Sequence, residues 1–178
     1  SPTRRLTLQH SASLTHSLAT QLASTLPGSL FTHCFFPLRQ VASTTQAFAV
    51  LASDGSIHTW GDANFGGTTV AVDPLPKAVA LYSTQVTQGC RLEDGGVVAW
   101  GDANNGGLIP PAQAALLGST VAIYANAGAF VAIAADGSVV TWGDDDAGGD
   151  SSAVAAKLVN VQSISHSGSA FTAMCRST

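Results

Sequence analysis

The side chains of this sequence that could bind a metal ion or take part in catalysis include a group of four carboxylates, those of Asp144, Asp145, Asp146 and Asp150. Carboxylate oxygens are the ligands that calcium prefers in proteins. A calcium loop of the EF-hand type needs ligands at alternating positions and a closing glutamate, and this segment has neither. The spacing therefore favours a solvated turn, and we expect no metal site here.

The histidines form no catalytic or zinc-binding pattern. None of the five belongs to an H-E-x-x-H motif, and His33 and Cys34 are adjacent, so their side chains point apart in a strand. His166 has no aspartate partner that the sequence assigns, and the residues around Ser169 do not complete the G-x-S-x-G motif of a nucleophilic serine. A phosphate-binding G-x-G-x-x-G loop is absent. The sequence therefore predicts no catalytic residues and no cofactor.

The three cysteines, Cys34, Cys90 and Cys175, lie far apart in the sequence, and none belongs to a C-x-x-C pair. This spacing gives no support for a thiol redox motif or a cysteine zinc site. Buried free thiols are favoured, and a single disulfide among the three stays open as an alternative.

Three segments of the chain, at 53–67, 93–107 and 135–150, align with one another. In each copy an Asp-Gly pair begins six residues before a tryptophan, and a Gly-Gly pair begins six residues after it. Because these residues recur in every copy, we assign them a structural role, in which the tryptophan packs each unit and the aspartate after Trp-Gly caps turn N–H groups. The repeated residues are Asp54, Gly55, Trp60, Gly61, Asp62, Gly66, Gly67, Asp94, Gly95, Trp100, Gly101, Asp102, Gly106, Gly107, Asp136, Gly137, Trp142, Gly143, Asp144, Gly148 and Gly149.

Each copy has the pattern of a β-hairpin, with apolar runs such as 129–135 and 138–142 on either side of the Asp-Gly pair. Asp-Gly in this position predicts a type I′ turn, in which both central residues have positive φ. Both runs are apolar on their two faces, so we expect them inside a stack of sheets. A further strand opens each unit, at 79–82, 121–124 and 161–164, with a weaker version at 40–43.

The segments AFAVLASDGSIHTWGDANFGG and AFVAIAADGSVVTWGDDDAGGD resemble the repeat of the regulator-of-chromosome-condensation family, whose blades carry a similar D-G-x-x-x-x-W-G core. The resemblance covers residues 41–178 and is closest to a divergent variant, abundant in unicellular algae, in which a Gly-Gly pair follows W-G-D. It implies a β-propeller, and family members serve as exchange-factor, ubiquitin-ligase-associated, light-signalling or scaffold modules. The family's usual G-Q-L-G ending is absent here, and the repeats supply about half of a seven-bladed ring. These departures argue against exchange-factor and chromatin roles.

The charge of the chain is low and unevenly distributed. Only 10% of the residues are charged, compared with roughly 25% in a typical soluble domain, and the net charge of -4 argues against nucleic-acid binding. Arg4, Arg5 and Arg39 all precede the first acidic residue, Asp54. Such a basic, Ser/Thr-rich start is typical of an organelle transit peptide, and a polar, irregular lead-in is the alternative. The apolar runs are too short to predict a membrane span.

Residues 1–40 are expected to form a separate arm. Four leucines recur every four residues and would form one apolar stripe on a helix, which either docks on a partner or packs across its own sheets. The run at 30–36 predicts a strand that could pair with the unfinished C-terminal unit. The candidate partner contacts of the arm are Leu14, Leu18, Leu22, Leu26, Phe35 and Phe36.

We therefore expect an all-β fold: a partial or small β-propeller of three to four blades after an N-terminal helix or extended arm. The repeats are expected at 41–78, 79–120 and 121–160, with a partial one at 161–178. An incomplete array has exposed strand edges. The N-terminal strand, a second copy of the chain or a partner protein are the three alternatives for covering them.

The expected function is that of a non-catalytic protein-interaction or scaffold module, an accessory subunit of a larger multi-protein assembly. A plastid photosynthetic complex, with peripheral attachment to its membrane, is the preferred setting, and the cytoplasm is the alternative. A regulatory propeller that acts on a small GTPase or in ubiquitin-linked substrate recognition is the second hypothesis. A propeller-type lyase or hydrolase is the third, and it would need a pocket where Glu93, the only glutamate, meets Arg91 and a histidine.

Overall fold

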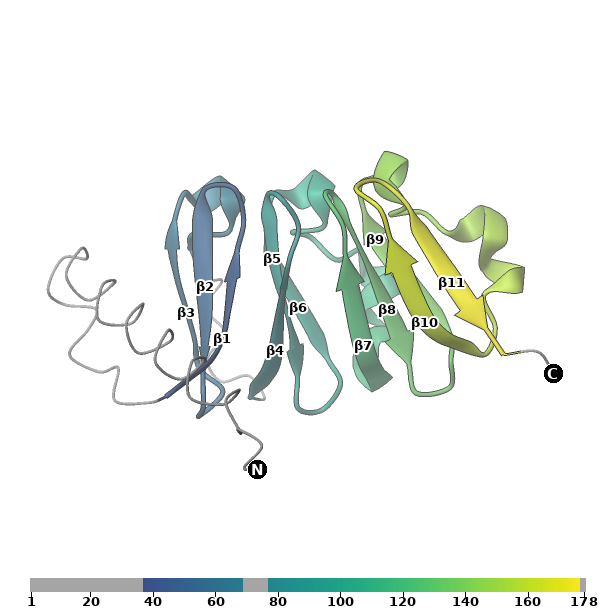
Figure 1. The fold of residues 1–178 in the computed structure, drawn as a ribbon, viewed down its shortest axis with the longest axis horizontal. Coiled ribbons are helices and arrows are strands. Elements are labelled where there is room, and N and C mark those ends of the chain that lie inside the picture. The colour runs from purple at the N-terminus through teal and green to yellow at the C-terminus, as the bar shows by residue number, and fades with distance from the viewer. Residues whose placement is uncertain (1–36, 69–76, 177–178) are drawn as a thin grey trace, which may run out of the picture. The chain divides into compact units, whose positions relative to one another are not determined.

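The computed structural model describes residues 37–68 and 77–176, which contain four small antiparallel sheets (Figure 1). Within each sheet the strands are neighbours in the order in which they occur in the chain. The first sheet consists of β1 (Leu38–Ser43), β2 (Ala47–Ala52) and β3 (Ile57–Gly61). The second consists of β4 (Ala78–Ser83), β5 (Thr87–Leu92) and β6 (Val97–Gly101). The third consists of β7 (Thr120–Ala125), β8 (Ala129–Ala134) and β9 (Val139–Gly143), and the fourth is the hairpin of β10 (Val161–His166) and β11 (Phe171–Cys175).

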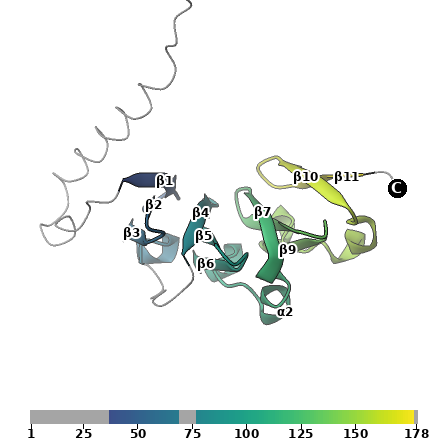
Figure 2. The same ribbon diagram turned by 90° about the horizontal axis from the view of Figure 1, so that it is seen from below.

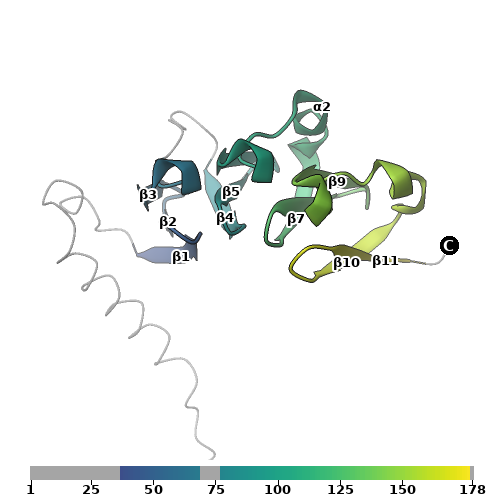
Figure 3. The same cartoon turned by 90° about the horizontal axis from the view of Figure 1, so that it is seen from above.

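Consecutive sheets of the unit Arg39–Thr178 lie side by side in chain order (Figures 2 and 3). Strand β2 contacts β4, β4 contacts β7, and β7 contacts β10. Small antiparallel sheets that follow one another in this way are the blades of a propeller-type array. The expected all-β fold of three to four blade-like units is therefore confirmed, with three complete sheets and one hairpin.

The middle strand of the third sheet, β8, is apolar because it lies between two neighbouring sheets. Every residue of β8 is buried. Phe130 and Ala132 pack toward the second sheet, and Val131 and Ile133 pack toward the terminal hairpin. Burial of each large side chain contributes about 1.5–3 kcal/mol. The alternation of β8 between two cores confirms the prediction of strands that are apolar on both faces.

The Asp-Gly turns differ from the type I′ turn that the sequence predicts. In the Asp-Gly turn of the third sheet Gly137 has positive φ, at 80°, and Asp136 does not. The N–H of Gly137 donates to Ala134 O, and Ala134 N–H donates to Ser138 O, both at 2.9 Å. This pattern is a three-residue loop in which a type I turn is followed by a left-handed glycine. Asp136 favours it because its Oδ1 accepts the N–H of Ser138 at 2.9 Å, which needs no positive φ at the aspartate.

Short helices connect the sheets. A single 3-10 turn follows the last strand of each complete sheet: η1 (Ala63–Phe65), η2 (Ala103–Asn105) and η4 (Asp145–Ala147). The links between sheets contain α2 (Pro111–Ala114), η3 (Leu117–Ser119) and η5 (Ser152–Lys157). Across the described ranges, no helix is long and apolar enough to cross a membrane.

The arm expected at 1–40 lies almost wholly outside the described residues, as does the strand predicted at 30–36. Its boundaries and its role therefore stay predictions. The candidate partner contacts that lie outside the described residues are Leu14, Leu18, Leu22, Leu26, Phe35 and Phe36.

Candidate interaction sites

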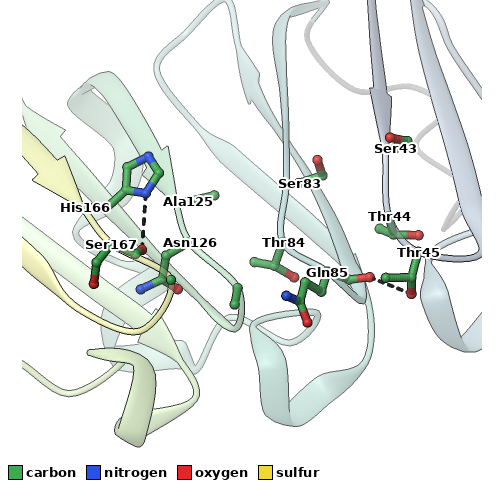
Figure 4. Close-up of a pocket in the computed structure, with 12 residues that line it drawn as sticks. Ser43, Thr44, Thr45, Ser83, Thr84, Gln85, Ala125, Asn126, His166 and Ser167 are labelled. Carbon is green, nitrogen blue, oxygen red and sulfur yellow. Dashed lines mark hydrogen bonds between the residues drawn. The ribbon is translucent and has the colours of Figure 1, made fainter.

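The turns that join the first two strands of each sheet lie together and line an open groove of about 680 Å³ (Figure 4). All four sheets contribute three residues each to its wall. The lining residues are Ser43, Thr44, Thr45, Ser83, Thr84, Gln85, Ala125, Asn126, Ala127, His166, Ser167 and Gly168. We call this surface the turn groove.

A side-chain cap at the same place in each repeat shapes the turns of the groove. Thr44, Thr84 and Asn126 each accept the backbone N–H of the residue three positions later, at 2.9 to 3.0 Å. Ser167 holds this place in the hairpin and accepts the N–H of Ser169 at 3.4 Å. These caps were not predicted from the sequence, although a hydroxyl or amide residue at one repeat position is a readable signal.

A run of backbone hydrogen bonds connects the four turns to one another. The N–H of Thr45 donates to Gln85 O at 2.8 Å, and the N–H of Gln85 donates to Ala127 O at 3.0 Å. The N–H of Ala127 continues the run by donating to Gly168 O at 3.1 Å. Because each turn is fixed to the next through its backbone, the turn groove is pre-formed, and the side chains of Ser43, Ser83 and Gln85 take no part in the hydrogen bonds that hold it.

The turn groove is polar but almost uncharged. His166 is the one ionisable side chain among its lining residues. Its Nδ1 lies 3.4 Å from Ser167 O, and its ring is tilted against Phe171 at 6.2 Å between ring centres. General acid–base catalysis commonly needs a second titratable group within hydrogen-bond reach, and the lining offers hydroxyls and amides instead. This surface is therefore suited to hydrogen bonding with a neutral polar segment.

Trp100 and Trp142 join the second and third sheets to the Gly-Gly pair of the sheet before each of them. The indole Nε1–H of Trp100 donates to Gly66 O at 3.0 Å, and that of Trp142 donates to Gly106 O at 3.2 Å. Gly106 has φ 94°, and a Cβ there would stand 2.8 Å from the ring of Phe130, so only glycine fits. The Trp and Gly-Gly motifs therefore act as a pair across the junction between two repeats.

The aspartates after Trp-Gly begin the 3-10 turns. Asp62, Asp102 and Asp144 are the N-cap residues of η1, η2 and η4, and each accepts at least one backbone N–H of its turn. The hydrogen bond from Asn105 Nδ2 to Asp102 Oδ1, at 2.8 Å, is the main cause that lowers the pKa of Asp102. Burial opposes this shift, and backbone N–H groups of η2 add to it.

The carboxylates of the third repeat are separate caps. Asp144 caps η4, whereas Asp150 accepts the backbone N–H of Ser152 at 2.8 Å and its hydroxyl at 3.0 Å. The same two groups hold the pKa of Asp150 below its usual value. In the part of the chain that the structure describes, no three or more His, Cys, Asp or Glu side chains are arranged to hold a metal ion.

A second, smaller groove of about 400 Å³ lies beside β9 and α2. Asp145 and Asp150 contribute to its lining, and Leu116, which is 63% exposed, forms part of its apolar wall. Neither groove is lined by Glu93 or Arg91, so neither is a pocket in which these two residues meet a histidine.

The described cysteines are free thiols in different surroundings. Cys90 is fully buried, and this burial raises the pKa of its thiol to about 11. Cys175 is exposed, and its Sγ lies 3.6 Å from Lys157 O. Cys34 lies outside the described residues. The expectation of a buried free thiol is therefore confirmed for Cys90 and is wrong for Cys175, which lies on the last strand, where its side chain is exposed.

No family model and no curated protein matches the chain. Its structure is similar to human WBSCR16, with TM-score 0.46, 16% identity and coverage of 61% of this chain and 34% of that one. It is also similar to the CRINKLY WD40 ectodomain of the receptor kinase ACR4 from Arabidopsis thaliana, with TM-score 0.44, 19% identity and coverages of 61% and 37%. For Prp20p from Saccharomyces cerevisiae the TM-score is 0.45, the identity 17% and the coverages 64% and 32%.

The likeness is one of fold. The chain spans about a third of the length of each of these proteins. Prp20 is the yeast RCC1, so a protein of the family that the repeats resemble is among the structural neighbours. The divergent W-G-D…G-G variant stays a prediction from the sequence.

Proposed function

We propose that this chain is a non-catalytic protein-interaction and scaffold module, and that a partner protein binds it along the turn groove. The observation that carries the proposal is the groove itself, to which all four sheets contribute equivalent residues. A partner segment that lies across it contacts every repeat at once. The partner segment thereby holds the repeats together. The same contacts attach this chain, as an accessory subunit, to a larger assembly.

The composition of the turn groove fits a polar protein segment better than a small enclosed molecule. Small-molecule sites are mostly apolar and concave, and they bury most of the ligand. The turn groove is open and offers the hydroxyls of Ser43 and Ser83 and the amide of Gln85. Backbone N–H and C=O groups of an extended segment are the natural partners of such side chains.

Site-specific photo-crosslinking tests this proposal. The full chain carries a benzophenone amino acid at Gln85, which is exposed in the turn groove, and is added to extract of its source cells. The matched control carries it at Asp94, exposed in the hairpin at the other end of β5. We expect one discrete crosslinked product from position 85, competed away by unlabelled chain, and none from position 94. Equal labelling from both positions, or a native mass equal to that of the chain alone, would overturn the proposal.

The same experiment separates this role from the regulatory alternative. Prp20p is described by its binding to Gsp1p and histones. Mass spectrometry identifies the crosslinked product, and a nucleotide-exchange assay then tests whether the chain acts on it. The regulatory role is favoured only if the product is a small GTPase and the chain accelerates its nucleotide exchange.

A further inference from the structure

The contact between consecutive repeats has the same components at both complete junctions. A buried tryptophan in the later sheet donates its indole N–H to the first glycine of the Gly-Gly turn in the earlier sheet. Trp100 and Trp142 are only 3% and 2% exposed, because the preceding turn covers their rings. The two junctions therefore show that the surface bound by this tryptophan face is a Gly-Gly turn.

The first sheet has the same tryptophan face without a described Gly-Gly turn over it. Phe48 and Trp60 stack at 5.6 Å and 15°, and Phe130 and Trp142 stack at 5.2 Å and 14°. Phe48 is nevertheless 45% exposed, whereas Phe130 is fully buried. Among the described residues, no carbonyl accepts the indole N–H of Trp60.

We propose that the Phe48–Trp60 face is a docking site for a partner protein that carries a repeat of this same type. The Gly-Gly turn of the partner repeat lies over the two rings, and the indole N–H of Trp60 donates to the carbonyl of its first glycine. This surface is distinct from the turn groove, and it extends the array at its first sheet.

Continuity with the existing junctions determines the chemistry of the partner. A side chain on the covering turn would collide with the ring beneath it, as the 2.8 Å approach at Gly106 shows. The partner must therefore present a left-handed glycine with an unpaired carbonyl. The carbonyl of Thr45 adds a second element of the match. At each of the three later turns the carbonyl in its place, that of Gln85, Ala127 or Gly168, accepts an N–H from the preceding repeat.

The test extends the full chain by one repeat. A copy of residues 78–119, with Phe in place of its tryptophan, is inserted directly before Leu38, so that a Gly-Gly turn precedes the first sheet. The chain then keeps its three native tryptophans, and the Trp60→Phe variant assigns the NMR signal of Trp60. Tethering raises the effective concentration of the partner repeat, so weak docking is still detected.

We expect the indole N–H of Trp60 to exchange freely in the unextended chain and to be protected roughly tenfold in the extended one, the factor of an ordinary hydrogen bond. Trp100 and Trp142 are internal controls, protected in both chains. A matched insertion with Gly106→Val in the added copy should leave Trp60 unprotected.

Two results would overturn the proposal. The first is an unprotected Trp60 in the extended chain. The second is a Trp60 that is already protected in the unextended chain, which would show that other residues of the chain occupy this face. A thermal measurement adds an independent check: Trp60→Phe should lower the melting temperature of the extended chain and leave that of the unextended chain unchanged.

Discussion

The indole Nε1 of Trp142 donates to the carbonyl oxygen of Gly106 at 3.2 Å, across the junction between the second and third repeats. The two residues belong to different copies of one motif, and Trp100 likewise donates to the Gly66 carbonyl of the copy before it. The Trp and Gly-Gly residues of the motif therefore stabilise the junction between two repeats. Substitutions of these residues should change the free energy of unfolding wherever two copies of the motif meet.

The first prediction concerns this hydrogen bond. Trp142→Phe removes a buried donor and part of a large buried side chain, and we expect it to lower the free energy of unfolding by about 2 kcal/mol. Urea unfolding followed by circular dichroism measures the change. Trp60→Phe is the matched control and should have less than about 0.5 kcal/mol of effect. Equal losses for the two variants would contradict the assignment.

The second prediction concerns Gln88, which lies opposite Trp100 where the first and third sheets have Phe48 and Phe130. Gln88 is fully buried, and neither its Oε1 nor its Nε2 has a hydrogen-bond partner among the described residues. Gln88→Phe removes this unsatisfied amide and restores the aromatic stack, so we expect stabilisation of about 1–3 kcal/mol.

Thermal unfolding measures this gain. The control is Gln162→Phe on an exposed position of β10, which should leave the melting temperature nearly unchanged. A lower melting temperature for Gln88→Phe would show that the site cannot hold the ring.

The third prediction concerns the glycine that covers Phe130. Gly106→Ala adds a Cβ 2.8 Å from the ring at a residue with φ 94°, so steric overlap and backbone strain act together. We expect a loss of about 2–3 kcal/mol. Gly118, where a Cβ meets nothing within 4 Å, is the control, and Gly118→Ala should be neutral. A tolerated Gly106→Ala would refute the close packing of this junction.

The fourth prediction concerns pH. The pKa of Asp102 is lowered, first by the side chain of Asn105, so the folded state binds its proton less readily than the unfolded state does. This contribution to stability is present above the unfolded pKa of 3.8 and is lost as the pH falls through the lower folded pKa. Urea midpoints measured from neutral pH to strongly acid pH should fall less steeply for Asp102→Asn than for the native chain. An unchanged slope would contradict the capping role.

The fifth prediction concerns thiol reactivity. Burial raises the pKa of Cys90 to about 11, so almost no thiolate forms at neutral pH. We expect a maleimide reagent to label Cys175 in the folded chain and Cys90 only after unfolding. Peptide mass spectrometry distinguishes the sites. Rapid labelling of Cys90 under native conditions would show that the core around β5 opens.

The repeat pattern predicted the sheets well because its residues act at fixed places in every copy. Asp54, Trp60 and Gly66 each stand where a turn, a packed ring or a cap is needed, and periodicity reveals them. The type I′ turn was wrong because Asp-Gly is compatible with more than one loop. The side chain of the aspartate selects the three-residue loop by accepting an N–H two residues later.

The turn groove could not be predicted in the same way. Its wall is made of residues such as Thr45, Gln85 and Ala127, whose types differ between repeats. They are joined to one another through backbone N–H and C=O groups, which every residue type except proline possesses. Only the capping residues, such as Thr44 and Asn126, left a signal in the sequence. The carbonyl that accepts the indole N–H could not be predicted either, because it belongs to the Gly-Gly pair of the preceding copy and not to the copy that contains the tryptophan.

The pairing of Trp100 and Trp142 with the Gly-Gly turns of the preceding repeats also has a consequence for how the gene can change. Both junctions between complete sheets use the same donor and the same acceptor, so a gene segment encoding one whole repeat between them can be duplicated or lost in register without leaving either junction unmatched. Recombination between copies then changes the length of the array while each contact keeps its chemistry. A duplication that begins or ends within a repeat can separate an indole from its carbonyl at the new junction, and such a junction should be less stable.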